Sequence, residues 1–292
     1  MELGRKTHLV REEEIATYER DGVVCLRGVL PLEWVARMEG PLEVGLGMRE
    51  TTVDMTEMAR KVAESGRSTL VDPEVRSERR GRFRSGVDHW RHQPAFRAFA
   101  AESPLPAIAA ALMRSSKVNL YEDSLLVKEP GTVEPTAFHQ DLSYFHVEGD
   151  QVCTLWCPLD PVSPESGAVV YVRGSHRWDR LFRPNLFVSD APIPGTSGEE
   201  VPPIREHPDE YDTVSFVMQP GDVAVHHART LHGSAGSRSA TERRRAISVR
   251  YCGDDVRYRV REGTPMKPHH HRMVAGDRLD SDDCPVVWRE EG

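Results

Sequence analysis

A histidine and a carboxylate two residues apart are the most chemically informative pair in this chain, in Phe138-His139-Gln140-Asp141. Side chains alternate between two faces of an extended segment, so His139 and Asp141 are expected to point to the same side. One further histidine would complete a set of two imidazoles and one carboxylate, which binds Fe(II) and leaves positions open for substrate and oxygen. Because the chain has 13 histidines, one such His-x-Asp pair is also expected by chance. The alternative interpretation of the pair is therefore two surface side chains that hydrogen-bond each other.

Three histidines in residues 221–234 could each supply the third metal ligand. They are His226, His227 and His232. A strand is predicted over residues 222–227, which would place two of them on a β element. Spacing alone leaves the choice among the three open.

The elements that must position these residues divide into helices first and strands later. Helices are predicted over residues 12–20, 31–38 and 94–113, the last broken near Pro104 and Pro106, and a strand is predicted over residues 23–30. Further strands, separated by Gly and Pro turns, are predicted over residues 119–128, 153–159, 168–172, 214–218, 222–227 and 246–252. This pattern predicts a β sandwich or barrel. We expect one domain over residues 1–292, with a helical part to about residue 117 and a β core over about 118–260.

Composition excludes several classes of protein. The 292 residues are 38% hydrophobic and 29% charged, which is ordinary for a globular chain with a sizeable core. The longest apolar stretches, such as residues 107–113, are too short to span a bilayer, so no membrane partner is expected. A formal net charge of −8 argues against nucleic acid as the main partner. The charged residues 1–6 lack the apolar run of a signal peptide.

Five cysteines, an odd number in a long chain, do not suggest a disulfide framework. They favour a reducing, cytoplasmic compartment. Cys153 and Cys157 have a spacing that could serve zinc, but no second cysteine pair follows, so buried thiols are the favoured interpretation.

Longer stretches of the sequence resemble the phytanoyl-CoA dioxygenase family of Fe(II)/2-oxoglutarate oxygenases. The similar motifs are VKEPG at 127–131, HQDLSYF at 139–145, SGAVVYVRGSH at 166–176, PGD at 220–222, LHGS at 231–234 and RRAIS at 244–248. Residues 18–24 and 276–281 are also similar, so the resemblance follows nearly the whole chain in order. It implies a double-stranded β-helix, the cupin-like jelly roll, flanked by helices, which agrees with the mainly β pattern above.

The resemblance implies three metal ligands. His139 and Asp141 match the first two, and His232 in its His-Gly-Ser motif matches the third. His226 and His227 are then interpreted as pocket lining or packing, because histidine is also a frequent structural residue.

The resemblance also implies residues that bind the co-substrate 2-oxoglutarate. A guanidinium suits its distal carboxylate, because it stays charged and can donate two parallel hydrogen bonds. Arg244 matches this position, although its spacing from His232 leaves Arg243 open, and Ser234 matches a hydroxyl at the same carboxylate. Further family contacts match Trp156, Ser124 and, by a looser alignment, Arg84.

Family chemistry implies oxidation of a small molecule, such as a secondary metabolite, by Fe(II), 2-oxoglutarate and O₂, with release of succinate and CO₂. Related halogenases have a small residue in place of the carboxylate ligand, so Asp141 favours hydroxylation, or another oxidation such as desaturation. Two alternatives stay open: a non-catalytic jelly-roll binding protein, and a metalloenzyme that does not use 2-oxoglutarate. The sequence specifies neither the substrate nor the oligomeric state.

Residues 185–212 form a long segment rich in proline, glycine and acidic residues. The resemblance places this connection at the mouth of the barrel, so we predict a lid that becomes ordered over substrate. The alternative is a surface excursion packed away from the site. Arg173, which stands where the family commonly has proline, is expected to form a surface ion pair rather than to bind an acidic substrate.

Overall fold

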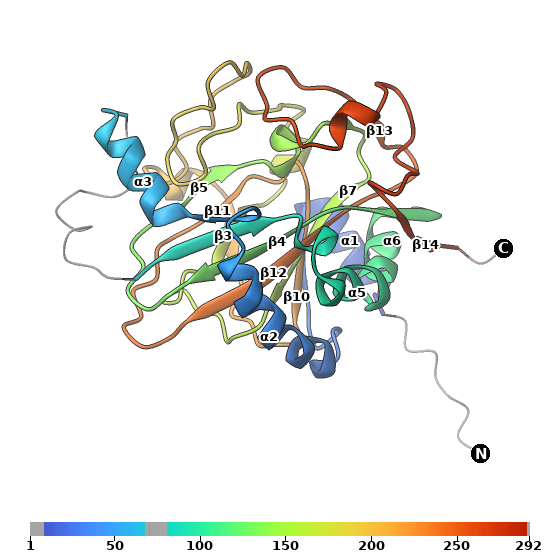
Figure 1. Ribbon diagram of the computed structural model, residues 1–292, viewed down its shortest axis with the longest axis horizontal. Helices are drawn as coiled ribbons and strands as arrows, with labels where there is room; N and C mark the ends of the chain where they lie inside the picture. Colours follow the sequence, from blue (N-terminus) through green and yellow to red (C-terminus); the bar gives the residue numbers. More distant parts are fainter. Residues whose placement is uncertain (1–8, 68–69, 71–80, 291–292) are drawn as a thin grey trace.

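Two antiparallel β-sheets dominate the computed structural model, which describes residues 9–67, 70 and 81–290 (Figure 1). Residues 1–8, where the sequence predicts no signal peptide, lie outside the described residues. None of the described helices combines the length and the apolar character needed to cross a membrane.

The elements follow one another in a helix-rich first part and a strand-rich second part. The α-helices are α1 (Glu12–Asp21), α2 (Leu32–Gly47), α3 (Met55–Glu64), α5 (Pro94–Glu102) and α6 (Leu105–Met113). The strands are β1 (Val23–Leu26), β2 (Thr52–Asp54), β3 (Phe83–Val87), β4 (Lys117–Lys128), β5 (Thr136–His139), β6 (Val147–Glu148), β7 (Val152–Pro158), β8 (Val169–Val172), β9 (Thr213–Ser215), β10 (Val223–His227), β11 (His232–Ser234), β12 (Arg244–Cys252), β13 (Arg257–Tyr258) and β14 (Val286–Arg289).

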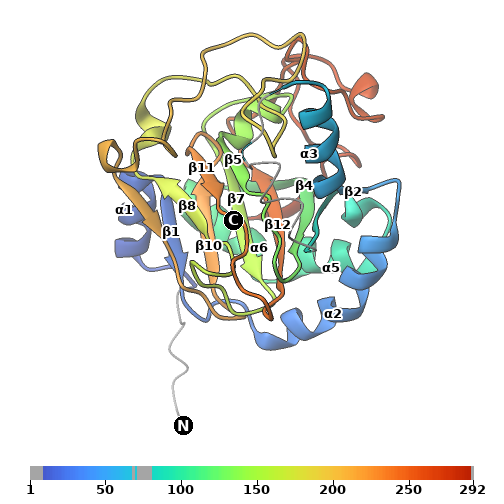
Figure 2. The same cartoon turned by 90° about the vertical axis from the view of Figure 1, so that its left-hand side faces the viewer.

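The large sheet has the strand order β1-β10-β7-β12-β4-β3-β2, and β14 pairs with the start of β4. Helices α1, α2, α5 and α6 cover one of its faces (Figures 1 and 2). Alternation along β4 accounts for the two faces. Leu125 and Val127 pack in the apolar core with the helices, whereas Ser124 and Leu126 line cavities on the opposite face.

The smaller sheet, in the order β5-β11-β8-β9, packs against the second face of the large sheet. Tyr171 on β8 joins Trp156 on β7 and Ala224 on β10 in a second apolar core between the sheets. Two facing antiparallel sheets with helices outside them confirm the predicted mainly β jelly roll with flanking helices.

Most predicted elements are present, with informative differences. Each strand predicted between residues 119 and 252 overlaps a strand of the structure, and the predicted break in 94–113 separates α5 from α6. The helix predicted over 31–38 is longer than expected and continues past Pro41 to Gly47. Leu42 and Leu46 explain this extension, because they keep the same apolar face buried. Strands β2, β3 and β14 join the large sheet from outside the range predicted for the β core.

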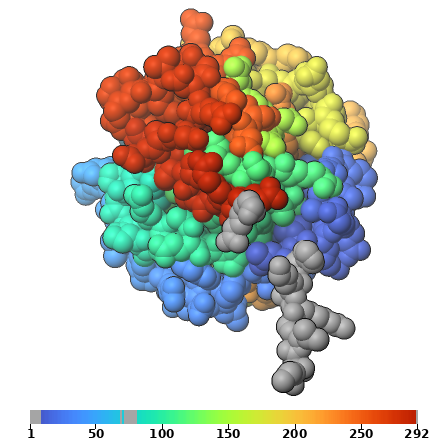
Figure 3. Space-filling view, turned by 90° about the vertical axis from the view of Figure 1, so that its right-hand side faces the viewer, coloured from blue at the N-terminus to red at the C-terminus, as the bar shows by residue number. Residues whose placement is uncertain are grey.

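Two largely irregular segments, residues 181–212 and 259–285, rise above the same end of the sheets in both ribbon views (Figures 1 and 2). The first contains one short 3-10 turn, Pro208–Glu210, which agrees with the irregular structure predicted there. Parts of it are nevertheless buried, including Val188 and Ser189. In Figure 3 the second segment, coloured red, spreads over the upper part of one face. Together these segments surround the end of the barrel where the functional residues gather.

Candidate metal centre

His139 and His232 lie directly opposite each other on paired strands, at the end of β5 and the start of β11. Asp141 follows in the 3-10 turn after β5. The ligand atoms of the three side chains lie within 4.8 Å of one another, and all three residues are buried. Within the described part of the chain, no other group of His, Cys, Asp or Glu side chains forms a candidate metal site.

Both imidazoles are oriented by the nitrogen that faces away from the centre. Nδ1 of His139 donates to the carbonyl of Ala137 at 2.8 Å, and Nδ1 of His232 donates to the carbonyl of Thr230 at 3.0 Å. Because a carbonyl oxygen only accepts, each ring carries a proton on Nδ1 and can present an unprotonated Nε2 to a metal. The two Nε2 atoms lie 3.5 and 3.8 Å from Oδ1 of Asp141.

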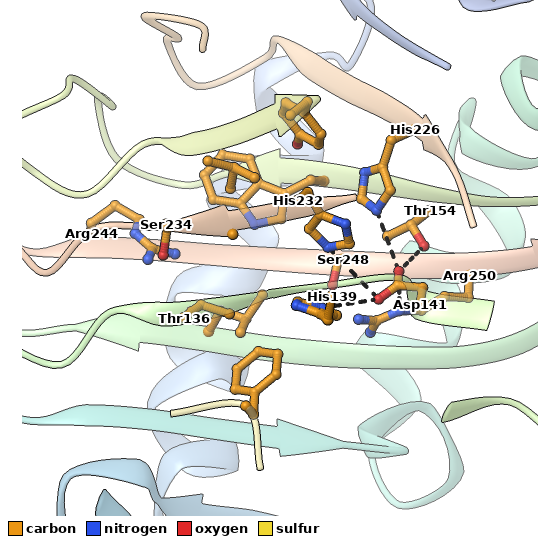
Figure 4. A pocket seen from close by; sticks show the side chains of 16 residues that line it. Thr136, His139, Asp141, Thr154, His226, His232, Ser234, Arg244, Ser248 and Arg250 are labelled. Carbon is orange, nitrogen blue, oxygen red and sulfur yellow. Dashed lines mark hydrogen bonds and ion pairs between the residues drawn. The ribbon is translucent and has the colours of Figure 1, made fainter. Parts of the chain in front are cut away.

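The second carboxylate oxygen of Asp141 has its own set of partners (Figure 4). Thr154 Oγ1 donates to Oδ2 at 2.5 Å, His226 Nε2 lies 3.3 Å from it, and Arg250 Nε lies 3.7 Å from it. Thr154 on β7 is paired in register with His226 on β10 and with Arg250 on β12. Burial acts to raise the pKa of Asp141, but Arg250 and the two histidine contacts hold it well below its usual range. The carboxylate is therefore ionised, with Oδ1 directed at the histidines.

An Fe(II) ion fits this donor set. Two imidazoles and one carboxylate on one side of an ion are the set that suits Fe(II) and leaves positions open. Burial and the neighbouring His139 and His226 lower the pKa of His232 well below its usual value, so the ring is neutral and able to bind a metal.

Three consecutive arginines lie at the start of β12, where Arg243 precedes the strand and Arg244 and Arg245 begin it, and each has different surroundings. Arg243 pairs with Glu43 and, at 3.1 Å, with Glu129, whereas Arg245 pairs with Asp160 at 2.6 Å. Arg244 is buried and forms no ion pair with any residue that the structure describes. Burial lowers its pKa to about 10, which still leaves the guanidinium charged at neutral pH. Among the described residues, Arg244 is thus a buried cation that forms no ion pair.

Arg244 and the three ligands line the same cavity (Figure 4). The guanidinium carbon lies 5.6 Å from the ring centre of Trp156, and Ser234 and Thr136 lie between Arg244 and the metal ligands. The remaining wall residues are Leu126, Thr154, Val169, Tyr171, Phe187, His226, Gly233, Ser248 and Arg250.

A larger cavity, of about 400 Å³, also has His139 and Asp141 in its wall. Apolar side chains from distant parts of the chain form much of its wall: Val53, Met55, Met58, Val87, Leu126, Phe145, Phe187, Ile193, Pro265 and Met266. Its polar wall includes Glu122, Ser124, Arg250 and Lys267. His139 and Asp141 therefore line both a small cavity, which contains Arg244, and a wider cavity with a largely apolar wall.

The family model described as Phytanoyl-CoA dioxygenase (PhyH) matches residues 18–246, which is most of the chain. The chain belongs to the phytanoyl-CoA dioxygenase family. Among curated relatives, a probable phytanoyl-CoA dioxygenase of Caenorhabditis elegans is 23% identical over 273 residues, which cover 89% of this chain and 81% of the relative.

Solved structures agree with the fold of this PhyH-family chain. It is similar to SnoK, a non-heme alpha ketoglutarate dependent carbocyclase from nogalamycin biosynthesis, with a TM-score of 0.69 and 23% identity over 98% of this chain and 100% of that one. It is also similar to the epimerase SnoN in complex with Fe³⁺, alpha ketoglutarate and nogalamycin RO. That match has a TM-score of 0.63 and 23% identity, over 95% of this chain and 98% of SnoN.

The PhyH-family chain is therefore an iron- and 2-oxoglutarate-dependent dioxygenase with a jelly-roll fold, as predicted. Iron, 2-oxoglutarate and O₂ are its cofactor and co-substrates.

The structure places the other predicted site residues of the PhyH-family chain in different surroundings. Trp156, Ser234 and Arg244 line the small cavity, and Ser124 lines the wider one. Arg84 lines neither, because its guanidinium pairs with Glu129 at 3.0 Å. A contact of Arg84 with 2-oxoglutarate stays a prediction from the resemblance.

Residues interpreted as packing or surface groups also have definite positions. Nε2 of His227 bonds the carbonyl of Asp150 at 2.7 Å, away from the metal ligands, whereas His226 reaches Asp141. Arg173 forms the expected ion pair, with Asp212 at 2.7 Å. Cys153 and Cys157 are buried free thiols, as expected.

Sequence reasoning missed Thr154, Ser248 and Arg250 in the wall of the small cavity. One signal was available for two of them. Ser248 and Arg250 lie on the strand predicted over 246–252 and follow Arg244 at even spacings, so all three side chains share a face if the strand begins at Arg244. Thr154 carries no such signal, because its position depends on how distant strands pair.

Proposed function

We propose that this dioxygenase hydroxylates a small organic molecule at an iron centre held by His139, Asp141 and His232. One observation carries the proposal: these three ligands share a cavity with Arg244, a buried guanidinium that pairs with no described carboxylate. The three ligands would hold the metal, and the cation would hold the distal carboxylate of 2-oxoglutarate.

In this proposal, Arg244 and Ser234 bind the distal carboxylate and Trp156 forms the adjoining wall. Ser124 acts from the neighbouring cavity through Ser248, whose hydroxyl lies 2.8 Å from its own. Burial of the site excludes bulk water, which strengthens the pairing of Arg244 with a carboxylate. Bound iron and 2-oxoglutarate supply the oxidising chemistry with O₂, and the chain holds, orients and shields the reactants.

The substrate would lie in the cavity of about 400 Å³, because His139 and Asp141 form part of its wall. Much of that wall is apolar, and its charged groups are already paired. Lys267 pairs with Glu122, and Arg250 lies 3.5 Å from Glu122. With no described wall cation left unpaired, a mainly apolar small molecule suits this cavity better than a highly charged conjugate.

Turnover with a panel of small apolar molecules tests the proposal. Anaerobic addition of Fe(II) and 2-oxoglutarate should produce a weak visible charge-transfer band, and a substrate should give succinate together with a product heavier by one oxygen. A product lighter by two hydrogens would replace hydroxylation by desaturation. Turnover without 2-oxoglutarate would contradict its assigned role. His232→Ala should abolish iron-dependent turnover, whereas His227→Ala, which removes an imidazole that bonds Asp150 instead, should retain it.

We further propose that the enzyme works as one domain in the cytoplasm. Strand β1 near the start of the chain and β14 near its end join the same sheet, which supports one folded unit. All five cysteines are free, and four of them are buried, which is in keeping with a reducing compartment. Fractionation of the native cells, with detection of the tagged chain, tests this location.

A further inference from the structure

Two cations occupy facing positions at the end of the small cavity that lies away from the metal ligands. Lys128 ends β4, Arg244 begins β12, and their Cα atoms are partners across the two strands. Lys128 is fully buried and Arg244 is nearly so. Lys128 lies on the same face of β4 as Ser124 and Leu126, which line the cavities.

The ammonium group of Lys128 is directed at Ser234. Its Nζ lies 2.9 Å from Oγ of Ser234 and 2.5 Å from the carbonyl oxygen of Ala235. When Lys128 is charged, its ammonium group can only donate, so the oxygen of Ser234 accepts this hydrogen bond. The proton of the Ser234 hydroxyl then has to point elsewhere. Ser234 lines the cavity with Arg244, whereas Lys128 itself does not line it.

The charges around Lys128 and Arg244 favour the binding of an anion. Burial lowers the pKa of Lys128 well below its usual value, and the nearby Arg244 and Arg205 lower it further, against the opposing effect of Glu134. Among the described residues, neither Lys128 nor Arg244 forms an ion pair, and the carboxylates of Glu134 and Asp160 act on them only through electrostatic attraction. A carboxylate bound beside Arg244 would favour the charged forms of both cations.

We propose that Lys128 is a positioning residue that makes the Ser234 hydroxyl a hydrogen-bond donor to the distal carboxylate of 2-oxoglutarate. By accepting from Lys128, the serine oxygen is left with its proton free for the carboxylate, so the hydroxyl is oriented before the co-substrate arrives. This inference rests on the proposed roles of Arg244 and Ser234. It adds to them a residue that acts through Ser234 without touching 2-oxoglutarate.

The test is a double-mutant cycle of Lys128→Met and Ser234→Ala, read out as binding rather than turnover. Dissociation constants are measured anaerobically with Fe(II), for 2-oxoglutarate and for 2-oxopentanoate, which has the same chain length but no distal carboxylate. Lys128→Met should weaken 2-oxoglutarate binding about ten-fold or more, since hydrogen bonds involving a charged group are among the stronger ones. It should leave 2-oxopentanoate binding unchanged. In the Ser234→Ala background the same substitution should cost several-fold less, because the residue through which it acts is gone.

Lys117→Met is the matched control, because Lys117 is a buried lysine at the other end of the same strand, paired with Asp280. It should lower stability without changing the preference for 2-oxoglutarate over 2-oxopentanoate. Equal losses for both ligands in Lys128→Met, or equal effects in the two backgrounds, would overturn the proposal. If the wild-type protein binds no 2-oxoglutarate, the failure belongs to the proposed function instead.

Should Lys128→Met fail to fold, a crystal structure of the wild-type protein with 2-oxoglutarate decides. The proposal requires Ser234 Oγ within hydrogen-bond distance of both Lys128 Nζ and the distal carboxylate. Direct contact of Nζ with the carboxylate, or a Ser234 that has left Nζ, would overturn it.

Discussion

The hydroxyl of Thr154 donates a 2.5 Å hydrogen bond to Oδ2 of Asp141, the oxygen that does not face His139 and His232. This bond gives the two oxygens of the Asp141 carboxylate different roles. Oδ2 is held by the large sheet, and Oδ1 is left to a metal. Partners of this kind orient a ligand, and removing them commonly weakens metal binding by one to two orders of magnitude.

Replacing Thr154 by valine should therefore weaken Fe(II) binding about 10- to 100-fold, because the methyl group keeps the shape but cannot donate. Anaerobic iron titration measures the change. Thr154→Ser, which retains the hydroxyl, should bind iron nearly as the wild type does. If the valine variant binds iron with unchanged affinity, Asp141 does not need this partner.

The arginine run provides a second prediction, on 2-oxoglutarate affinity. Arg244→Ala should weaken binding by orders of magnitude, since leaving one partner of a buried charge pair alone costs roughly 3–5 kcal/mol. Arg243→Ala and Arg245→Ala should have little effect, because their guanidinium groups are paired with Glu129 and Asp160. Isothermal titration of the iron-loaded proteins compares the three. A large loss in Arg243→Ala with none in Arg244→Ala would move the role to Arg243.

The segment of residues 185–212 should act as a lid whose first residues are anchored near the metal. The ring of Phe187 lies 5.2 Å from that of His139, and Asn185 exchanges hydrogen bonds with Tyr144 at 2.8 and 3.0 Å. We expect shortening of residues 194–201, beyond this anchor, to raise succinate formed per product, because water would enter during turnover. Iron and 2-oxoglutarate binding should stay nearly unchanged. Limited proteolysis provides the check: equally fast cleavage with and without the full set of substrates would exclude a lid.

Acid should destabilise the protein through buried neutral histidines. Burial lowers the pKa of His89 to about 4 and that of His270 to about 3. The unfolded chain takes up these protons near pH 6.5, so their stabilisation is complete above about pH 6.5 and declines as the pH falls towards 4. The decline is at most about 1.4 kcal/mol per pH unit for each histidine in that window.

His89→Asn should therefore reduce the difference in Tm between about pH 7.5 and about pH 5, measured by thermal unfolding. The same change at the exposed His207 should leave that difference as it is in the wild type. An identical pH dependence in wild type and His89→Asn would show that this histidine does not contribute.

The limits of sequence reasoning are visible in particular residues. Local pattern and resemblance located His139, Asp141 and His232, and the structure brings them together. The choice between Arg243 and Arg244 needed the position of Glu129, which is more than a hundred residues away in sequence. Thr154 and His226 became partners of Asp141 only through the register of β7 and β10. Such register is a long-range property, so no local window of the sequence contains it.

Strand β12 carries both Arg250, beside Asp141, and Arg244, at the far end of the cavity. The six residue steps from Arg244 to Arg250 therefore set the distance between the end of the site that would bind the distal carboxylate and the end that would bind the metal. A single-residue insertion between the two arginines would turn one of them through the sheet to the helix-covered side. Insertions within this stretch of β12 should thus be far more damaging than insertions in the loops that surround the barrel.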